Sequence, residues 1–153
     1  MTTAWRVVEK DPLMSTPPPL PPARPLPPSG PKLVRSAAVE PVRFGPLSDY
    51  RRLTGEDGLP VFTGIQTCEP GYATPMHWHP YVECLFVLEG HMEAVMQGQE
   101  DAPLRLGAGD MIALPAHAPH LFRTFGDATL RILGIHASPT RIVNIVSDQS
   151  ATP

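Results

Sequence analysis

Residues 71–90 of the chain read GYATPMHWHPYVECLFVLEG. His77 and His79 stand two positions apart, so on an extended strand both imidazoles leave the same face. Glu83 follows His79 by four positions, beyond Pro80. Its carboxylate faces back toward the imidazoles if Tyr81 begins a neighbouring strand or a bend. The segment therefore predicts a short strand with a cluster of candidate metal ligands.

A further histidine, His120, lies far away in the sequence, directly after Pro119 and at the start of another predicted strand. Three imidazoles and one carboxylate that converge on one point suit a single divalent transition metal, with iron, manganese, nickel, cobalt, copper and zinc all left open. The alternative is a set of surface or hydrogen-bonded histidines, which is the more common role of a histidine taken alone.

Short segments rich in β-branched and aromatic residues recur on both sides of this stretch, separated by glycine and proline. This spacing is typical of an all-β sandwich or barrel. One turn of helix is expected at 47–53, and 141–146 is either a last strand or a short terminal piece. The other strands are expected at 61–68, 81–88, 91–96, 104–106, 111–114, 121–125 and 129–137.

Prolines divide the chain, because ten of its 21 prolines fall between Asp11 and Pro31. Proline lacks a backbone N–H and has a fixed φ, so this stretch predicts an extended arm of polyproline-II type. The expected organisation is an arm at 1–35, a β-barrel domain at 36–148 and a flexible tail at 149–153. Residues 19–24, PLPPAR, fit a ligand of SH3-type domains, although a plain spacer is the preferred interpretation.

Composition excludes several classes of protein. The 153 residues carry a formal net charge of -3, so the basic surface that nucleic-acid binding needs is absent. No apolar run approaches the roughly 20 residues of a membrane-spanning helix, and the N-terminal residues lack a secretory signal pattern. A cytoplasmic protein that binds neither nucleic acid nor membrane is expected. Two cysteines make no disulfide framework.

The spacing of these histidines and of the glycines and prolines around them also resembles that of a known family. Gly71-x5-His77-x-His79-x3-Glu83-x6-Gly90 resembles the first motif of the cupins, and Gly109-x5-Pro115-x-His117-x2-His120-x3-Thr124 resembles the second. Two positions depart from the family pattern: His117 replaces a glycine and Thr124 replaces an asparagine. A histidine tolerates positive φ better than most residues, so the turn at His117 is expected to persist.

The resemblance implies a small single-domain cupin, a jelly-roll or double-stranded β-helix barrel with a metal inside. By this resemblance His77, His79, Glu83 and His120 are the metal ligands. A homodimer is also implied, with 39–44 as the candidate edge strand. His117 is a weak candidate for an acid or base near the metal, and an exposed loop position is its preferred interpretation. No catalytic residue is otherwise assigned.

Alternation along the strands predicts an apolar pocket for a small organic molecule, lined by Met76, Leu85, Val87, Ile112 and Phe122. Arg43, Arg123 and Arg131 are the basic residues that could anchor a substrate carboxylate. The preferred function is a metal-dependent, dioxygenase-like oxidoreductase. A metal-dependent lyase, decarboxylase or isomerase is one alternative, and a non-enzymatic sensor of a small molecule or metal is the other.

Overall fold

The structure is a computed structural model that describes residues 30–146. Most of the predicted N-terminal arm, with its SH3-ligand pattern, and the predicted tail lie outside these residues. Within them, Val34 to Val146 belong to one compact unit. No helix in the described range has the length or the apolar character needed to cross a bilayer.

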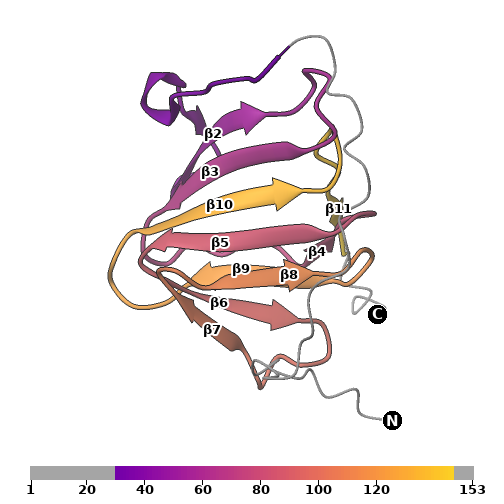
Figure 1. Cartoon of the computed structure of the whole chain (residues 1–153). Helices are drawn as coiled ribbons and strands as arrows, with labels where there is room; N and C mark the ends of the chain where they lie inside the picture. The colour runs from indigo at the N-terminus through magenta and orange to yellow at the C-terminus, as the bar shows by residue number, and fades with distance from the viewer. Residues whose placement is uncertain (1–29, 147–153) are drawn as a thin grey trace, which may run out of the picture. The chain divides into compact units, whose positions relative to one another are not determined.

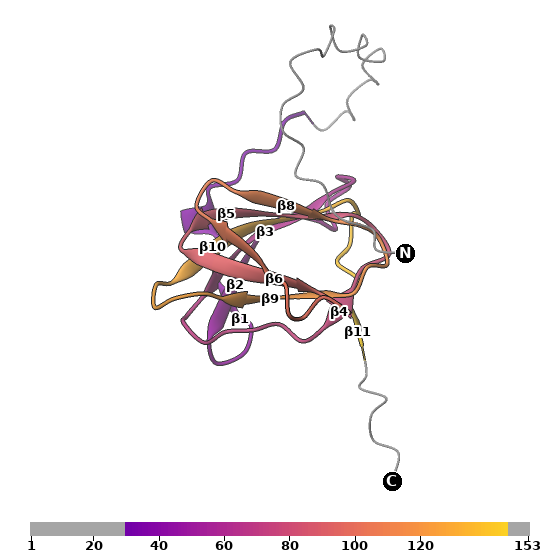
Figure 2. The same ribbon diagram turned by 90° about the horizontal axis from the view of Figure 1, so that it is seen from below.

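The described residues form two antiparallel sheets that face each other (Figures 1 and 2). The first sheet has the order β1-β2-β3-β10-β5-β8 and the second β11-β4-β9-β6-β7. The prediction of an all-β fold is confirmed. The elements are η1 (Ser36–Ala38), β1 (Val42–Arg43), β2 (Ser48–Thr54), β3 (Phe62–Cys68), β4 (His77–Trp78), β5 (Glu83–Glu89), β6 (His91–Met96), β7 (Leu104–Gly107), β8 (Met111–Leu114), β9 (His120–Thr124), β10 (Leu130–His136) and β11 (Asn144–Ile145).

Three central strands of the first sheet alternate strictly between buried and half-exposed residues over most of their length. Their buried side chains lie in rows across the sheet, because β10 pairs with both β3 and β5. The row at one end contains two ionisable side chains, the next has two glycines opposite each other, and the third is mostly apolar. From the polar end inward the rows are Phe62–His136–Glu83, Gly64–Gly134–Leu85 and Gln66–Ile132–Val87.

The prediction for one element was wrong. Residues 47–53 do not form a turn of helix, because Ser48–Thr54 is strand β2 and pairs with β3. The local sequence has no strong preference for either structure, and the pairing with β3 decides it. The segment 141–146 holds only the two-residue strand β11. Before it, the backbone N–H of Ile142 donates to the hydroxyl of Tyr81 instead of to a sheet.

Val42–Arg43, inside the predicted edge segment 39–44, forms β1 at the edge of the first sheet. Val42 is 65% exposed. A homodimer formed through this edge stays a prediction.

The apolar core lies between the sheets, and truncating a residue in it should destabilise the protein. Leu130 is fully buried, whereas Leu104 in β7 is 47% exposed. We expect Leu130→Ala to lower the free energy of unfolding by about 2–5 kcal/mol, because it leaves a cavity, and Leu104→Ala by less than about 1 kcal/mol. Urea denaturation followed by circular dichroism measures both. Equal losses in the two variants would contradict this description of the core.

Candidate metal centre

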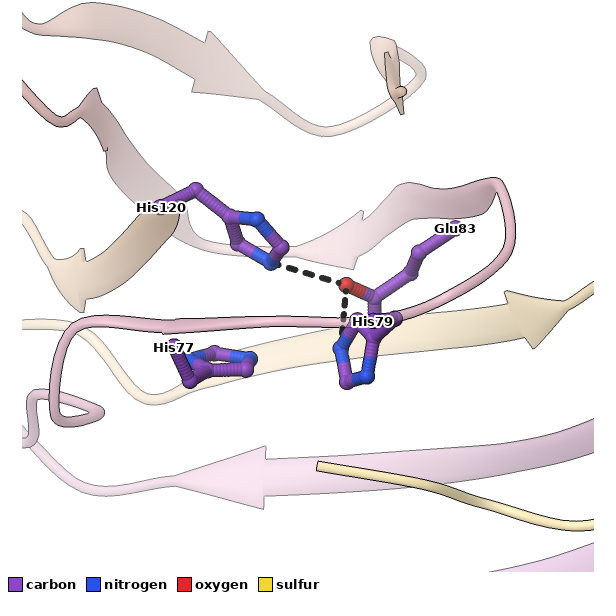
Figure 3. A group of neighbouring side chains, drawn as sticks. All are labelled: His77, His79, Glu83 and His120. Carbon is purple, nitrogen blue, oxygen red and sulfur yellow. Dashed lines mark hydrogen bonds and ion pairs between the residues drawn. The ribbon is translucent and has the colours of Figure 1, made fainter. Parts of the chain in front are cut away.

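Both sheets contribute to one group of buried side chains (Figure 3). His77 lies in β4 and pairs with His120, the first residue of β9. Glu83 is the first residue of β5 in the facing sheet, and His79 lies in the connection between β4 and β5. The structure thus brings together the four residues predicted as ligands. One candidate ligand atom from each lies within 4.8 Å of the others.

Backbone carbonyls hold one nitrogen of each imidazole. Nδ1 of His77 lies 2.8 Å from the oxygen of Pro75, Nδ1 of His79 2.5 Å from that of Ile142, and Nδ1 of His120 2.8 Å from that of Ala118. A carbonyl oxygen only accepts, so Nδ1 carries the hydrogen in all three rings. In a neutral ring of this tautomer Nε2 keeps its lone pair, which is the form in which histidine binds a metal.

The carboxylate of Glu83 lies among these rings, with Oε2 3.1 Å from Nε2 of His120 and 3.2 Å from Nε2 of His79 (Figure 3). Burial on its own raises the pKa of this carboxyl. The close approach of His120, His79 and His136 outweighs that effect, and the pKa lies well below its usual range. Glu83 is therefore ionised at neutral pH. Desolvation lowers the pKa of His77 to about 4, so that ring is neutral and free to bind a metal.

The donor set fits a metal ion. Nε2 of His79 is buried and, despite its distance to Glu83, has no partner with hydrogen-bond geometry. An unpaired buried nitrogen is costly, and coordination to an ion would satisfy it. Three imidazole nitrogens and one carboxylate oxygen suit a divalent transition metal rather than calcium or magnesium. Binding itself, and the choice of metal, remain predictions.

Sequence reasoning did not assign a role to His136, which belongs to the same polar cluster. His136 is 2% exposed, and its Nε2 lies 3.4 Å from Oε1 of Glu83. Its Nδ1 is buried without a partner. The sequence pattern that could have placed His136 inside is the alternation along β10. Leu130 and Ile132 are core residues, and His136 shares their face.

A cavity of about 20 Å³ lies beside Glu83, large enough for roughly one water. Leu85 and Phe122 line it, as predicted, but Met76, Val87 and Ile112 do not. Val87 belongs to the core at the level of Ile132, and Ile112 packs against that core from β8. The predicted apolar lining was wrong in part, because polar residues share it: Tyr50, Gln66, Thr74, His77, Glu83, His136 and Arg141.

His117 does not join the cluster. Its φ of +63° confirms the expected left-handed turn, and its backbone N–H donates to the oxygen of His79. The side chain is exposed, and its ring lies 5.1 Å from that of Trp78. This matches the loop interpretation and removes His117 from the candidate acid or base groups.

The three arginines considered as substrate anchors are engaged elsewhere. Arg43 pairs with Asp49, Arg123 with Glu93 and Arg131 with Glu89. None of the three lines the cavity. The arginine that does is Arg141, which the sequence did not single out.

Comparison with known proteins agrees with this fold. The family model described as "Cupin domain" matches residues 64–136. The chain is 42% identical over 55 residues to dimethylsulfoniopropionate lyase DddQ of Ruegeria pomeroyi, a match that covers 36% of this chain and 26% of that protein. The chain thus spans only about a quarter of that relative.

Two solved structures show the likeness of the fold. The polyketide cyclase RemF from Streptomyces resistomycificus has a TM-score of 0.66 at 28% identity, over 78% of this chain and 87% of that one. The oxalate decarboxylase of Lactobacillus farciminis has a TM-score of 0.62 at 20% identity, over 72% of this chain and 34% of that one. The predicted jelly-roll barrel of the cupin type is confirmed.

If the four residues bind one ion, removing any of them should release it. We expect His77→Ala and His120→Ala to lose most of the bound metal, whereas His91→Ala, at an exposed position outside the cluster, should keep it. Elemental analysis of protein purified without a nickel column gives the metal content. Undiminished metal in either cluster variant would contradict the assignment.

Metal-free protein should lose stability in acid. Desolvation lowers the pKa of His136 to about 4 from an ordinary 6.5, so the unfolded chain binds more protons than the folded one between these values. The free energy of unfolding should therefore fall as the pH drops from 6.5 to 4. We expect a smaller fall in His136→Gln and an unchanged one in His91→Gln, measured by urea denaturation across this range. Identical pH profiles for wild type and His136→Gln would count against a buried, neutral His136.

Proposed function

Because residues 64–136 form a cupin domain, we propose that this chain is a metal-dependent enzyme of the lyase or cyclase class. Its substrate is an organic molecule with an enolisable carbonyl, and its reaction makes or breaks a bond to carbon without dioxygen. The observation that carries the proposal is the buried group of three inward-facing imidazole nitrogens and one ionised carboxylate.

The choice of this class over a dioxygenase rests on the comparisons. The relatives are named as a lyase, a cyclase and a decarboxylase. A reaction that breaks a C–H bond beside a carbonyl develops negative charge on the carbonyl oxygen. A divalent ion held by the four residues would supply a Lewis acid for that charge.

The chain also provides a group that can take a proton from carbon. His136 lines the cavity, and Glu83 faces its Nε2. In the tautomer with hydrogen on Nε2, Nδ1 keeps a lone pair and has no partner among the described residues. Proton transfer to Nδ1 leaves an imidazolium that the Glu83 carboxylate stabilises. The electron pair of the broken C–H bond moves into the carbonyl to give an enolate.

The enolate can then react in two ways, and both reactions belong to the proposed class. In a cyclisation its carbon attacks a second carbonyl of the same substrate, and the new alkoxide regains the proton. In an elimination the electron pair forms a C=C bond and expels a group from the β-carbon. Both outcomes balance without an oxidant, and both need water kept from the enolate. The surrounding side chains, among them Leu85, Phe122 and Ile132, provide that exclusion.

The test is an anaerobic assay on a panel of poly-β-keto acids and β-substituted carboxylic acids, with the zinc-, manganese- and iron-loaded protein. We expect turnover that is unchanged by removal of oxygen. His136→Gln should lower kcat at least about 100-fold while metal content stays constant, and His91→Gln should match the wild type. Product formation that consumes oxygen would favour a dioxygenase. Tight ligand binding without any turnover would favour a sensor.

A further inference from the structure

Arg141 lies between β10 and β11 and has a buried Nε with no hydrogen-bond partner among the described residues. It lines the cavity beside Glu83. A buried guanidinium N–H that lacks an acceptor costs free energy, and a charged one costs more than a neutral one. The position of Arg141 therefore needs an explanation.

Arg141 differs in this respect from five other arginines of the described chain. These five pair with a carboxylate at 2.5–3.3 Å: Arg43 with Asp49, Arg52 with Glu56, Arg105 and Arg123 with Glu93, and Arg131 with Glu89. No carboxylate of residues 30–146 forms an ion pair with Arg141.

Two aromatic rings orient the guanidinium. Its central carbon lies 4.9 Å from the ring centre of Phe44 and 5.7 Å from that of Tyr50. Contacts of this kind use the faces of the rings, whereas the N–H donors of arginine lie in the guanidinium plane. The aromatic contacts therefore hold the group in place and leave its donors for an oxygen ligand.

The backbone beside Arg141 is tied to the metal centre. The carbonyl of Ile142 accepts from Nδ1 of His79 at 2.5 Å and from the hydroxyl of Tyr81 at 3.1 Å. The N–H of Ile142 donates to the same hydroxyl at 2.7 Å. His79, one of the predicted ligands, thus fixes the segment that carries Arg141. The position of Arg141 relative to the metal centre is therefore fixed as well.

Tyr50 supplies a second donor at the same place. Its hydroxyl is buried without a partner and lies over Gly64, where an added Cβ would come within 2.1 Å of it. Burial raises the pKa of Tyr50 to about 12, so the phenol keeps its hydrogen at neutral pH. A fixed O–H and a fixed guanidinium then face the same cavity, and both can donate to an oxygen atom.

The cavity and a neighbouring groove share these two residues. A groove of about 610 Å³ lies outside the cavity, and Tyr50 and Arg141 line both. The groove also has an apolar lining that suits the carbon skeleton of a small molecule: Val39, Val42, Phe44, Phe62 and Val143. An organic ligand that reaches Glu83 from this groove brings its polar atoms past the two donors.

We propose that Arg141 and Tyr50 bind a carboxylate of the substrate, which makes the substrate an organic acid whose carbonyl reaches the metal centre. The inference rests on the proposed function for its reactive carbonyl, but the carboxylate site itself does not require the metal. An arginine and a phenol that both donate to one carboxylate form charge-assisted hydrogen bonds. The neutral ester of the same acid lacks them.

The experiment compares 3,5-dioxohexanoate with its methyl ester on the full chain, both metal-free and zinc-loaded. Titrations followed by the ¹⁵N–¹H resonance of the Arg141 Nε–H report on this site directly, since the resonance is assigned by its loss in Arg141→Met. We expect the acid to shift this resonance and the ester not to. The acid should bind at least tenfold more tightly than the ester, with or without zinc.

In Arg141→Met that preference should disappear while the affinity for the ester stays within twofold. Tyr50→Phe, which keeps the ring, should lower the preference at least threefold. Arg131→Met, which removes a surface arginine paired with Glu89, should leave it unchanged.

Three results would overturn the carboxylate site: no shift of the Arg141 resonance, a preference that survives in Arg141→Met, or no binding of the acid by the wild type. A preference that exists only with zinc and survives in Arg141→Met would mean that the carboxylate binds the metal, which leaves the proposed function intact. Conversely, a preference that depends on Arg141 in a protein without turnover would support the carboxylate site and contradict the proposed enzyme.

Discussion

The burial of one carboxylate shapes the interior of this protein. Glu83 is 6% exposed and ionised, and an isolated charge in such a place costs several kcal/mol. The rings of His79, His120 and His136 all approach its oxygens, while backbone carbonyls hold the far nitrogens of His79 and His120. Because the candidate ligands come from both sheets, the sheets must keep their spacing for these contacts to persist. The polar cluster therefore links the two sheets and is also the candidate reaction centre.

Much of this arrangement could be predicted from the sequence, since it depends on local spacing. The period of two places His77 and His79 together, and glycine and proline mark the ends of most strands. The convergence of His120 and Glu83 on the same point was less accessible from the residues alone. It depends on β4 pairing with β9 and on β5 lying in the opposite sheet, and only the resemblance to a family supplied it.

The residues that were missed have their partners far away in the chain. Tyr50 was placed in a turn of helix, yet β2 pairs with β3, and its hydroxyl lies over Gly64. Arg141 follows the last long strand, in a segment with no periodicity, and its position depends on contacts that Ile142 makes about 60 residues away in sequence. Neither pattern nor composition encodes such contacts. Sequence reasoning therefore found the candidate ligands of the metal and part of the apolar lining, and overlooked Tyr50 and Arg141 in the same cavity.

Gly64 of β3 and Gly134 of β10 lie opposite each other and differ in the space around them. A methyl group on residue 134 would meet its neighbours at 3.8 Å or more, an ordinary contact, and would take up part of the hollow. A methyl group on residue 64 would collide with Tyr50. The two positions thus tolerate mutation unequally. Substitution at this single position of β10 could therefore change the size of the cavity while the candidate metal ligands and the two sheets stay unaltered.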